Sequence, residues 1–337
     1  MKLPFIGLQW FAGEGTRVAD VIVPEVFNRY VTERTAEVSR LRQSGIIGNV
    51  PGLQVPNGGV LVNMPFWNDL GNGDEVLSDT TPLTPNKIQA GNDVAAVLMR
   101  GKSWKANDLA SAFSGEDVMG AIARLVAEFW ARTEQATLIE ILKGVFASAS
   151  MNDNMLDISA SAGAAGSIDK NALIDAISLL GDSGRNLTGI VCHSAVMYDL
   201  AKKSVLDARV NVGDTSTAPE FQTYLGRQVI DDDGCPVETV SGEKVYTTYI
   251  FGAGAIGSAI GTPPVPTETE RKALEGNDIL VNRRHFILHP RGVKWLNAAL
   301  TTGESTPGNV ALAKGANWQR VYEPKNVRIV CFKHKIG

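Results

Sequence analysis

Residues 114–146 read SGEDVMGAIARLVAEFWARTEQATLIEILKGVF. Ser114 can cap the first turn of a helix, and Asp117 follows it by three residues. Side chains recur at steps of three and four residues, which excludes a strand and predicts one buried stripe on a helix. The stripe is Val118, Ile122, Leu125, Val126, Phe129, Arg132 and Thr133. Roughly thirty residues at about 1.5 Å each give a rod of about 45 Å, so we expect a scaffold helix, with an ordinary core helix as the alternative.

The composition is that of a soluble globular protein, with 337 residues of which 44% are hydrophobic and 20% are charged. A chain of this length can form two or three lobes, each with its own core. The formal net charge of -4 provides no global basic surface to recruit nucleic acid, which disfavours a nucleic-acid specialist. No apolar stretch approaches the roughly twenty residues that cross a bilayer, so the sequence predicts no membrane partner.

The three cysteines, Cys192, Cys235 and Cys331, are odd in number and far apart in the sequence. This spacing predicts neither a disulfide framework nor a zinc site, and it favours a reducing compartment. The opening MKLPFIGLQWFAGEG carries one positive charge, and Gln9 interrupts its short apolar run. Because no small-residue cleavage site follows, we expect no signal peptide.

The first 50 residues are predicted to form an N-terminal arm. An extended piece leads to Pro24, and the pattern of a short helix follows until Gly45 ends it. Such a segment could pack on a neighbouring molecule as readily as on its own chain.

Residues 51–110 are predicted to form an extended β-hairpin. Two alternating apolar runs, GGVLVNMPFW and AAVLMRGKSWKAND, flank a stretch rich in Gly, Asn, Asp, Thr and Pro. That stretch holds too few large apolar residues for a core, so we expect it to project and to contact another molecule. The candidate contact residues are Phe66, Trp67, Leu70, Val76, Leu77 and Ile88.

Residues 168–255 have the pattern of an α/β lobe. A helix in DKNALIDAISLLGD, a strand in NLTGIVCHSA and a helix in AVMYDLAKKS alternate, which is typical of α/β units. A further strand is predicted in YLGRQVIDDD. The stretch KVYTTYIFGAGAIGSAIG predicts one or two more strands, with glycines that allow bends.

The last part of the chain returns to strands. The piece TPPVPTETERKALEGND is Pro-rich and then charged, which favours a connection between lobes. ILVNRRHFILHPRGVKWLN predicts a strand that enters a turn at Pro290 and Gly292. NVRIVCFKHKI predicts a closing strand, preceded by a short helix around Ala311.

A run of three carboxylates is a candidate cation site. Asp231, Asp232 and Asp233 precede Gly234, and hard cations bind several carboxylate oxygens. The alternate spacing and distal Glu of an EF-hand loop are missing, however. The pattern therefore favours a solvated turn at the end of a strand.

Three other patterns are incomplete as catalytic or ligand sites. His285 and His289 are four residues apart but lie on a strand-like segment, whereas a zinc-binding HExxH motif needs one helical face. Cys192 and His193 lack a third group that would orient a nucleophile and base. The GxGxxG run from Gly252 to Gly257 lacks the following helix and acidic residue of a dinucleotide fold. We therefore predict no catalytic residue, no metal and no cofactor.

The order of these parts resembles the major capsid protein of tailed bacteriophages, whose fold is shared with encapsulins. GIVCHSAVMYDLAKKS, LGRQVIDDD and YTTYIFGAGAIGSA are similar to the axial lobe of that family, in the family's order. The opening LQWFAGEG is similar to the start of capsid proteins from phages of Gram-positive hosts. HPRGVKW and ANWQRVYEPKNVRIVCFKHK resemble one capsid subfamily, so the resemblance covers nearly the whole chain.

The resemblance implies an α+β tailed-phage major capsid fold. Its parts would be an N-terminal arm (1–50), an extended hairpin loop (51–110), a peripheral domain (111–167 and 256–337) with the spine helix 114–146, and an α/β axial domain (168–255). The axial domain would lie at the centre of each pentamer or hexamer, and the hairpin over a neighbouring subunit. Some relatives cross-link subunits through a hairpin lysine; Lys87, Lys102 and Lys105 are present, but the partner asparagine and glutamate cannot be matched, so we expect no cross-link.

The implied function is that of a structural subunit, not an enzyme, that self-assembles into an icosahedral phage head and encloses double-stranded DNA without binding it specifically. Its location would be the virion, and the host cytoplasm during assembly. Separate scaffolding, portal and decoration proteins are candidate partners. Three alternatives stay open: an encapsulin-type nanocompartment shell, a cytosolic hydrolase or oxidoreductase that uses Cys192, His193 or the glycine run, and a phage tail or adaptor protein. The phage-like opening and the long hairpin favour the virus.

Overall fold

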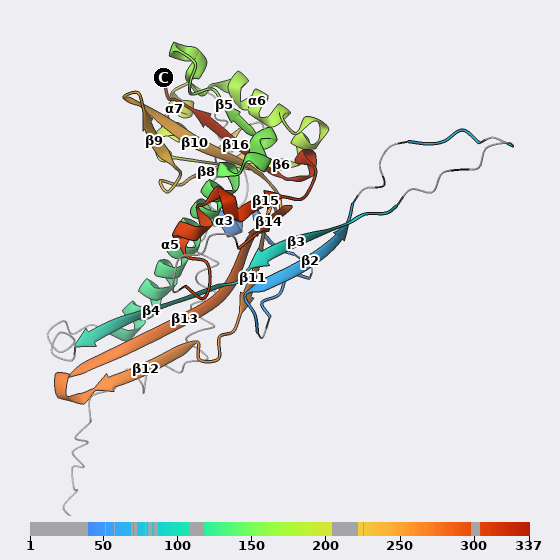
Figure 1. Cartoon of the computed structure of the whole chain (residues 1–337). Coiled ribbons are helices and arrows are strands. Elements are labelled where there is room, and N and C mark those ends of the chain that lie inside the picture. Colours follow the sequence, from blue (N-terminus) through green and yellow to red (C-terminus); the bar gives the residue numbers. More distant parts are fainter. Residues whose placement is uncertain are drawn as a thin grey trace, which may run out of the picture. The chain divides into compact units, whose positions relative to one another are not determined.

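The computed structural model is shown in Figure 1. It describes residues 40–337 except 51, 57, 69, 71–72, 78, 80–82, 84–86, 108–117, 204–221, 225 and 298–303. The predicted N-terminal arm up to residue 39, with its short helix, lies outside the described residues. So do Ser114 and Asp117, which were predicted to begin the long helix.

The described residues fall into two compact units. The smaller unit contains the described parts of Arg100–Phe129 and Thr262–Arg284, and the larger unit contains those of Ala36–Met99, Trp130–Gly261 and His285–Gly337. The four-part organisation expected from the sequence, with its boundaries near residues 50, 110, 167 and 255, stays a prediction.

The predicted long helix is α5 (Val118–Ala147), whose 30 residues form the longest helix among the described residues. The predicted stripe is wrong at Leu125, which is 58% exposed, and at Arg132, which is also exposed. The side chains that are buried, at steps of three and four residues, are Val126, Trp130, Glu134, Thr137, Ile141 and Val145. The observed stripe therefore follows Trp130, which the predicted stripe omitted, and from Thr137 onward the helix is buried on almost every side.

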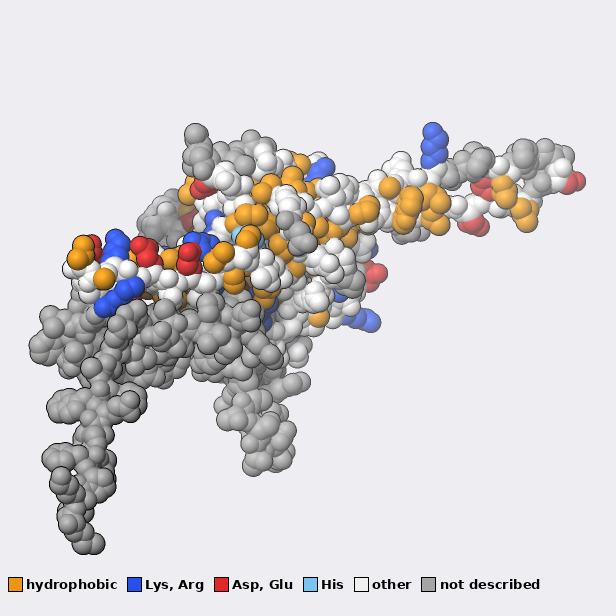
Figure 2. Space-filling view, turned by 90° about the horizontal axis from the view of Figure 1, so that it is seen from below, with side chains coloured by type: hydrophobic (Ala, Val, Ile, Leu, Met, Phe, Trp, Pro, Cys, Tyr) orange, Lys and Arg blue, Asp and Glu red, His pale blue; other side chains and the backbone are white. Residues whose placement is uncertain are grey.

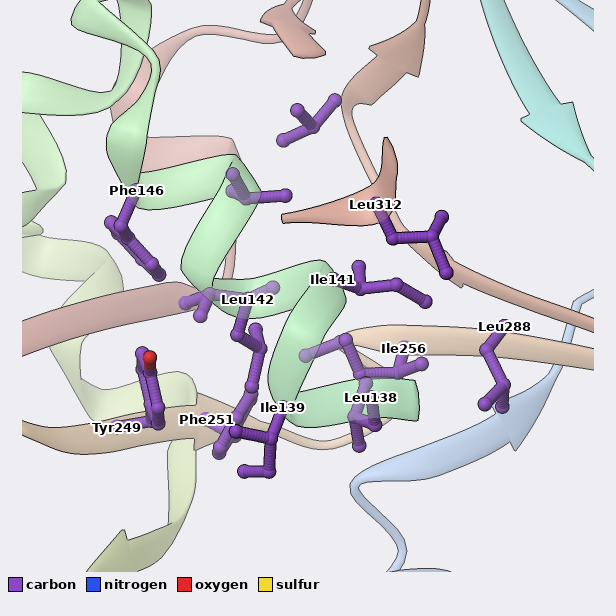
Figure 3. Close-up of a cluster of buried hydrophobic side chains, with 14 of the residues drawn as sticks. Leu138, Ile139, Ile141, Leu142, Phe146, Tyr249, Phe251, Ile256, Leu288 and Leu312 are labelled. Carbon is purple, nitrogen blue, oxygen red and sulfur yellow. The ribbon is translucent and has the colours of Figure 1, made fainter. Parts of the chain in front are cut away.

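The core of the larger unit is built around the second half of α5 (Figure 3). Apolar side chains of this half pack against strands β10 (Glu243–Gly252), β11 (Ile256–Gly261) and β13 (Asn277–Pro290) and helix α8 (Asn309–Leu312). The labelled members are Leu138, Ile139, Ile141, Leu142, Phe146, Tyr249, Phe251, Ile256, Leu288 and Leu312. The short helix α3 (Arg40–Gln43) is tied to α5 by Arg42, whose guanidinium lies 2.8 Å from the carboxylate of the buried Glu134. Within this unit the helix is thus a central element of the core, and its role as a scaffold for the rest of the chain stays a prediction.

A sheet with seven strands among the described residues forms the α/β lobe. Its spatial order is β5 (Met155–Asp157), β16 (Ile329–His334), β10 (Glu243–Gly252), β6 (Leu187–Cys192), β8 (Arg227–Asp231) and β7 (Gln222–Tyr224), and β9 (Val237–Val240) also pairs with β10. Helices α6 (Lys170–Ser178) and α7 (Ser194–Lys202) bury Leu173, Val196 and Leu200 in its second core cluster. The predicted alternation of helix, strand, helix and strand is confirmed.

A second sheet is organised by the long strand β13 (Asn277–Pro290). Its other strands are β1 (Ile47–Asn49), β4 (Leu98–Asn107), β11 (Ile256–Gly261) and β12 (Thr267–Lys272). The second half of β13 pairs with β11 within the larger unit, and its first half pairs with β12 within the smaller unit.

The charged piece at residues 262–278 was predicted to be a connection, and this prediction is wrong because it contains β12. The charges of β12 are held by ion pairs to β13: Arg271 lies 3.1 Å from Asp278, and Glu268 lies 3.0 Å from Arg283. Charged side chains are common on edge strands because they discourage pairing with other chains. Because of these charged residues, the sequence of β12 looks like that of a loop.

The predicted hairpin is present, but its second strand lies earlier in the sequence than expected. The expected second run, residues 95–108, forms mainly β4, which pairs with β13, and part of the expected tip forms β3. The observed hairpin is β2 (Leu61–Trp67) paired antiparallel with β3 (Ala90–Ala96), in a register that runs from Leu61 opposite Ala96 to Trp67 opposite Ala90. The two strands lie side by side in Figure 1.

After β13 the chain turns at Gly292, as predicted, into β14 (Val293–Trp295), which pairs with β15 (Trp318–Arg320). Pro290, the other residue predicted in this turn, is instead the last residue of β13 and pairs with Ile256. The predicted short helix is α8 (Asn309–Leu312). Short 3-10 helices occur at Ala149–Asn154, Gly163–Gly166, Gly181–Asn186, Ala273–Glu275, Gly315–Asn317 and Pro324–Asn326.

His334 should make the α/β lobe sensitive to acid. Its Nδ1–H donates to the carbonyl oxygen of Lys335 at 3.0 Å, and its Nε2 accepts from the Thr248 hydroxyl at 2.8 Å. Burial lowers the pKa of His334 from 6.5 to about 4. The neutral ring therefore stabilises the fold above pH 6.5, and this contribution is lost as the pH falls toward 4.

We expect this group to lower the free energy of unfolding by roughly 2–3 kcal/mol between neutral pH and pH 4. Urea unfolding at a series of pH values measures it. His334→Gln should show a smaller acid-induced loss than the wild type, and an equal loss in the two proteins would contradict the assignment.

Candidate assembly interface

The hairpin presents apolar side chains that its own chain leaves uncovered. Five of the six candidate contact residues are among the most exposed large apolar residues of the described chain: Trp67 (72%), Leu70 (73%), Val76 (91%), Leu77 (80%) and Ile88 (62%). Leu83, which the sequence reading did not select, is 58% exposed. Figure 2 shows hydrophobic side chains along the hairpin, at the right of the view. Exposed apolar groups gathered on one segment are typical of a protein–protein contact.

The tip of the hairpin also has an acidic character. Between residues 68 and 92 the sequence contains the acidic residues Asp69, Asp74, Glu75 and Asp79 and the single basic residue Lys87. Red acidic side chains lie beside the hydrophobic ones in Figure 2. A surface that receives this tip would therefore combine apolar groups with lysine or arginine.

Phe66, the sixth candidate, has a different environment. Its ring is partly buried and meets the ring of Tyr322 edge-on, with centroids 4.6 Å apart and an interplanar angle of 77°. Phe66 therefore packs within its own chain, at the outer end of the paired strands, next to the tip of the hairpin.

Cys192 and His193 have structural roles in the α/β lobe. Cys192 is buried, and burial raises the pKa of its thiol to about 12, so the nucleophilic thiolate is not formed at neutral pH. The Nδ1 of His193 accepts a hydrogen bond from the Ala195 amide at 3.1 Å, which caps the start of α7. A nitrogen engaged in capping is not a free general base.

We expect Cys192→Ala and His193→Ala to keep particle formation, with stability losses of about 1–2 kcal/mol from the lost packing and the lost cap. Thermal melting measures the losses, and electron microscopy counts the particles. Normal folding combined with a complete loss of particles would contradict this expectation.

In the Asp231–Asp233 run, Asp231 ends β8, and Asp232 and Asp233 lead into the turn that follows the strand. Asp232 Oδ1 accepts from the Gly234 amide at 2.8 Å, and Asp233 Oδ1 accepts from the Ser194 amide at 3.2 Å. Hydrogen bonds from Ser194 lower the pKa of Asp233. The carboxylates thus organise the turn and the start of α7, and the absence of a bound metal stays a prediction.

His285 and His289 lie on β13, in agreement with the strand expected there. His289 is buried, and its Nε2 lies 2.9 Å from Asp93 Oδ1 on β3. The glycine run passes from β10 directly into β11, so a strand follows it where a dinucleotide fold has a helix. The pairing of Asp93 with His289 was not predicted from the sequence. The one feature that could have indicated it is the position of a carboxylate among apolar residues of a strand.

Among the described residues, no three His, Cys, Asp or Glu side chains are grouped so that they could hold a metal ion. In the same part of the chain, no helix is both long enough and apolar enough to cross a membrane.

Comparison with known proteins identifies relatives of the whole chain. The family model Gp13-like, described as major capsid protein 13-like, matches residues 78–327. The major capsid protein of Bacillus phage SPP1 is 47% identical over 326 residues, which are 95% of this chain and 98% of that protein.

Solved structures agree on the fold. The cyanophage Pam1 capsid asymmetric unit matches with a TM-score of 0.56 at 15% identity, over 88% of this chain and 92% of that one. The capsid of Ralstonia phage GP4 matches with a TM-score of 0.56 at 8% identity, over 89% and 91%. These two likenesses show a tailed-phage capsid fold, as expected from the sequence. The family model over residues 78–327 and the relative at 47% identity show that the chain belongs to the Gp13-like family of major capsid proteins and is a capsid shell protein of a bacteriophage.

Proposed function

We propose that this chain assembles with copies of itself, as pentamers and hexamers, into the icosahedral head shell that encloses double-stranded DNA. The observation that carries the proposal is the set of exposed apolar side chains on the hairpin, at Trp67, Leu70, Val76, Leu77 and Ile88. Each of these side chains would be buried if the hairpin lay over a neighbouring subunit. Burying apolar surface is the main favourable term in protein association.

The remaining parts of the proposal follow the organisation expected from the sequence. The α/β lobe at residues 168–255 would be the axial domain at the centre of each capsomer, and residues 111–167 and 256–337 the peripheral domain. The subunit would have no catalytic activity, would reach the virion after assembly in the host cytoplasm, and would meet separate scaffolding, portal and decoration proteins. The net charge of -4 suits a shell that holds DNA without binding it specifically.

Photo-cross-linking tests the hairpin contact. A photoreactive residue replaces Leu77, and particles are assembled from a mixture of ¹⁴N-labelled and ¹⁵N-labelled copies. We expect cross-linked peptide pairs that combine the two labels, because the tip would lie on another copy. The same probe at Ile174, which is 41% exposed on α6, is the control for non-specific capture. Cross-links from Leu77 that stay within one label would contradict the proposal.

A further inference from the structure

One face of β3 is pinned to the body of the larger unit. Gly91, Asp93 and Ala95 share this face, because side chains of a strand alternate between its two sides, and the residue directly after the strand is Val97. Asp93, Ala95 and Val97 are buried. Ala95 and Val97 pack with Ile287 of β13 in a small apolar cluster. The base of the hairpin is thus anchored by apolar packing first.

A buried polar pair interrupts the apolar face one step further out. The Asp93 carboxylate uses both oxygens: Oδ1 lies 2.9 Å from His289 Nε2, and Oδ2 accepts from the Gly292 amide at 3.2 Å. The side chains of Asp93 and His289 are only 4% and 2% exposed. The other ring nitrogen of His289, Nδ1, is buried and has no hydrogen-bond partner within the described structure. A carboxylate buried at this point would be costly without its two donors.

An aromatic contact forms the outermost layer. Phe66 stands opposite Gly91, and its ring fills the space where a side chain at Gly91 would lie. The same ring meets Tyr322 edge-on, and a Cβ at Gly292 would lie 2.6 Å from the Tyr322 ring, so Tyr322 closes over the turn that donates to Asp93. The residue after Phe66 is Trp67, which is 72% exposed. The pinned part of the hairpin therefore ends at Phe66.

We propose that Phe66, Asp93, His289, Gly292 and Tyr322 form a root latch that fixes the register and the exit direction of the hairpin before subunits meet. The polar pair supplies the register, since a slip of one residue would turn the carboxylate to the opposite face of the strand. A hairpin already held in one direction loses less conformational freedom when it binds. These residues are positioning residues for assembly, and this inference rests on the proposed role of the hairpin.

Hydrogen exchange of the β2 and β3 amides in the free, full-length subunit tests the latch. Asp93→Asn weakens the polar pair, His289→Leu removes the donor, and His289→Gln keeps an N–H donor. We expect exchange in both strands to be about tenfold faster in the first two variants, as the loss of one buried hydrogen bond implies, and close to wild type in His289→Gln. Thr248→Val is the matched control, because it removes a buried hydrogen bond to His334 in the α/β lobe. It should lower the melting temperature and leave β2 and β3 exchange unchanged.

Phe66→Leu changes the packing of the latch without burying an unpaired polar group. It tests the latch if the Asp93 and His289 variants do not fold. It should also speed exchange in the hairpin alone. Unchanged exchange in the folded latch variants, or an equal rise in Thr248→Val, overturns the latch. The critical concentration for shell formation then tests whether the latch prepares the hairpin for assembly. We expect this concentration to be higher in the variants with faster hairpin exchange than in the wild type. Faster exchange with an unchanged critical concentration overturns the preparatory role and leaves the proposed function intact, whereas a wild-type chain that forms no shell overturns the proposed function itself.

Discussion

Replacing residues 69–88 by Asn-Gly should leave a folded subunit that forms no closed shells. The Asn68 amide donates to the Gln89 carbonyl oxygen at 2.9 Å, so a two-residue type I′ turn can close the hairpin at this point. None of the described residues that are removed is buried, so the cores should be unaffected. The change removes Leu70, Val76, Leu77, Leu83 and Ile88, which are exposed apolar side chains. Without them the contact with a neighbour should fall below the level needed for a stable shell.

Circular dichroism and cooperative melting measure the fold, and electron microscopy measures the shells. Lys87→Gln is the matched control, since it changes one polar residue of the same tip and should assemble normally. A second variant keeps the length of the tip and replaces Leu70, Val76, Leu77 and Ile88 by Ser; we expect it to fail as the shortened chain does. Normal shells from the shortened chain would remove the hairpin from the account, and loss of folding would place the tip in a core.

Gly144→Ala should destabilise the subunit. At an exposed helix position, by contrast, replacing Gly by Ala stabilises the helix by about 1 kcal/mol. Gly144 lies in α5, and a Cβ there would collide with the carbonyl oxygen of Leu312 and lie 2.6 Å from Nε1 of Trp318. These two groups are joined by a hydrogen bond of 2.7 Å. Overpacking and the disturbed bond together should lower the free energy of unfolding by about 2–4 kcal/mol.

Chemical denaturation of the free subunit gives this free energy. Lys143→Ala is the control at the adjacent, half-exposed position of the same helix, where its ammonium pairs with Glu140, and we expect a change below about 0.5 kcal/mol. A Gly144→Ala variant as stable as the wild type would show that α8 and β15 can move away from the helix, contrary to the close packing described.

Elements with a strong local pattern could be predicted from the sequence. The long helix, the alternation of helices and strands around β6, and the first hairpin strand each follow from hydrophobic period and turn residues. The second hairpin strand was expected at residues 95–108, because the run that forms β4 has the stronger apolar alternation. The observed stripe on α5 differs from the predicted one because Ala127, Trp130 and Ala131 are buried and Leu125 is exposed, and which face is buried depends on the partners of the helix. Periodicity within one segment carries no information about those partners. β12 was missed because its charges have local ion-pair partners on β13, and a charged segment looks like a loop when its neighbour is unknown.

Among the candidate contact residues, some properties could likewise be predicted from local sequence, and others depend on residues that are remote in the chain. Exposure of Leu77 could be expected, since the tip has too few apolar residues for a core. The role of Phe66 could not, because it depends on Tyr322, more than 250 residues later in the chain. Asp93 and His289 are likewise joined across 196 residues. Pairings of this kind are set by the fold, and a single sequence does not display them.

The most direct test of the shell assignment is sedimentation and negative-stain electron microscopy of the purified full-length chain over a range of protein concentrations. We expect a concentration above which large closed particles appear at the expense of free subunits, with few species of intermediate size. A small oligomer of constant size at every concentration, with no closed particles in the microscope, would contradict the shell assignment.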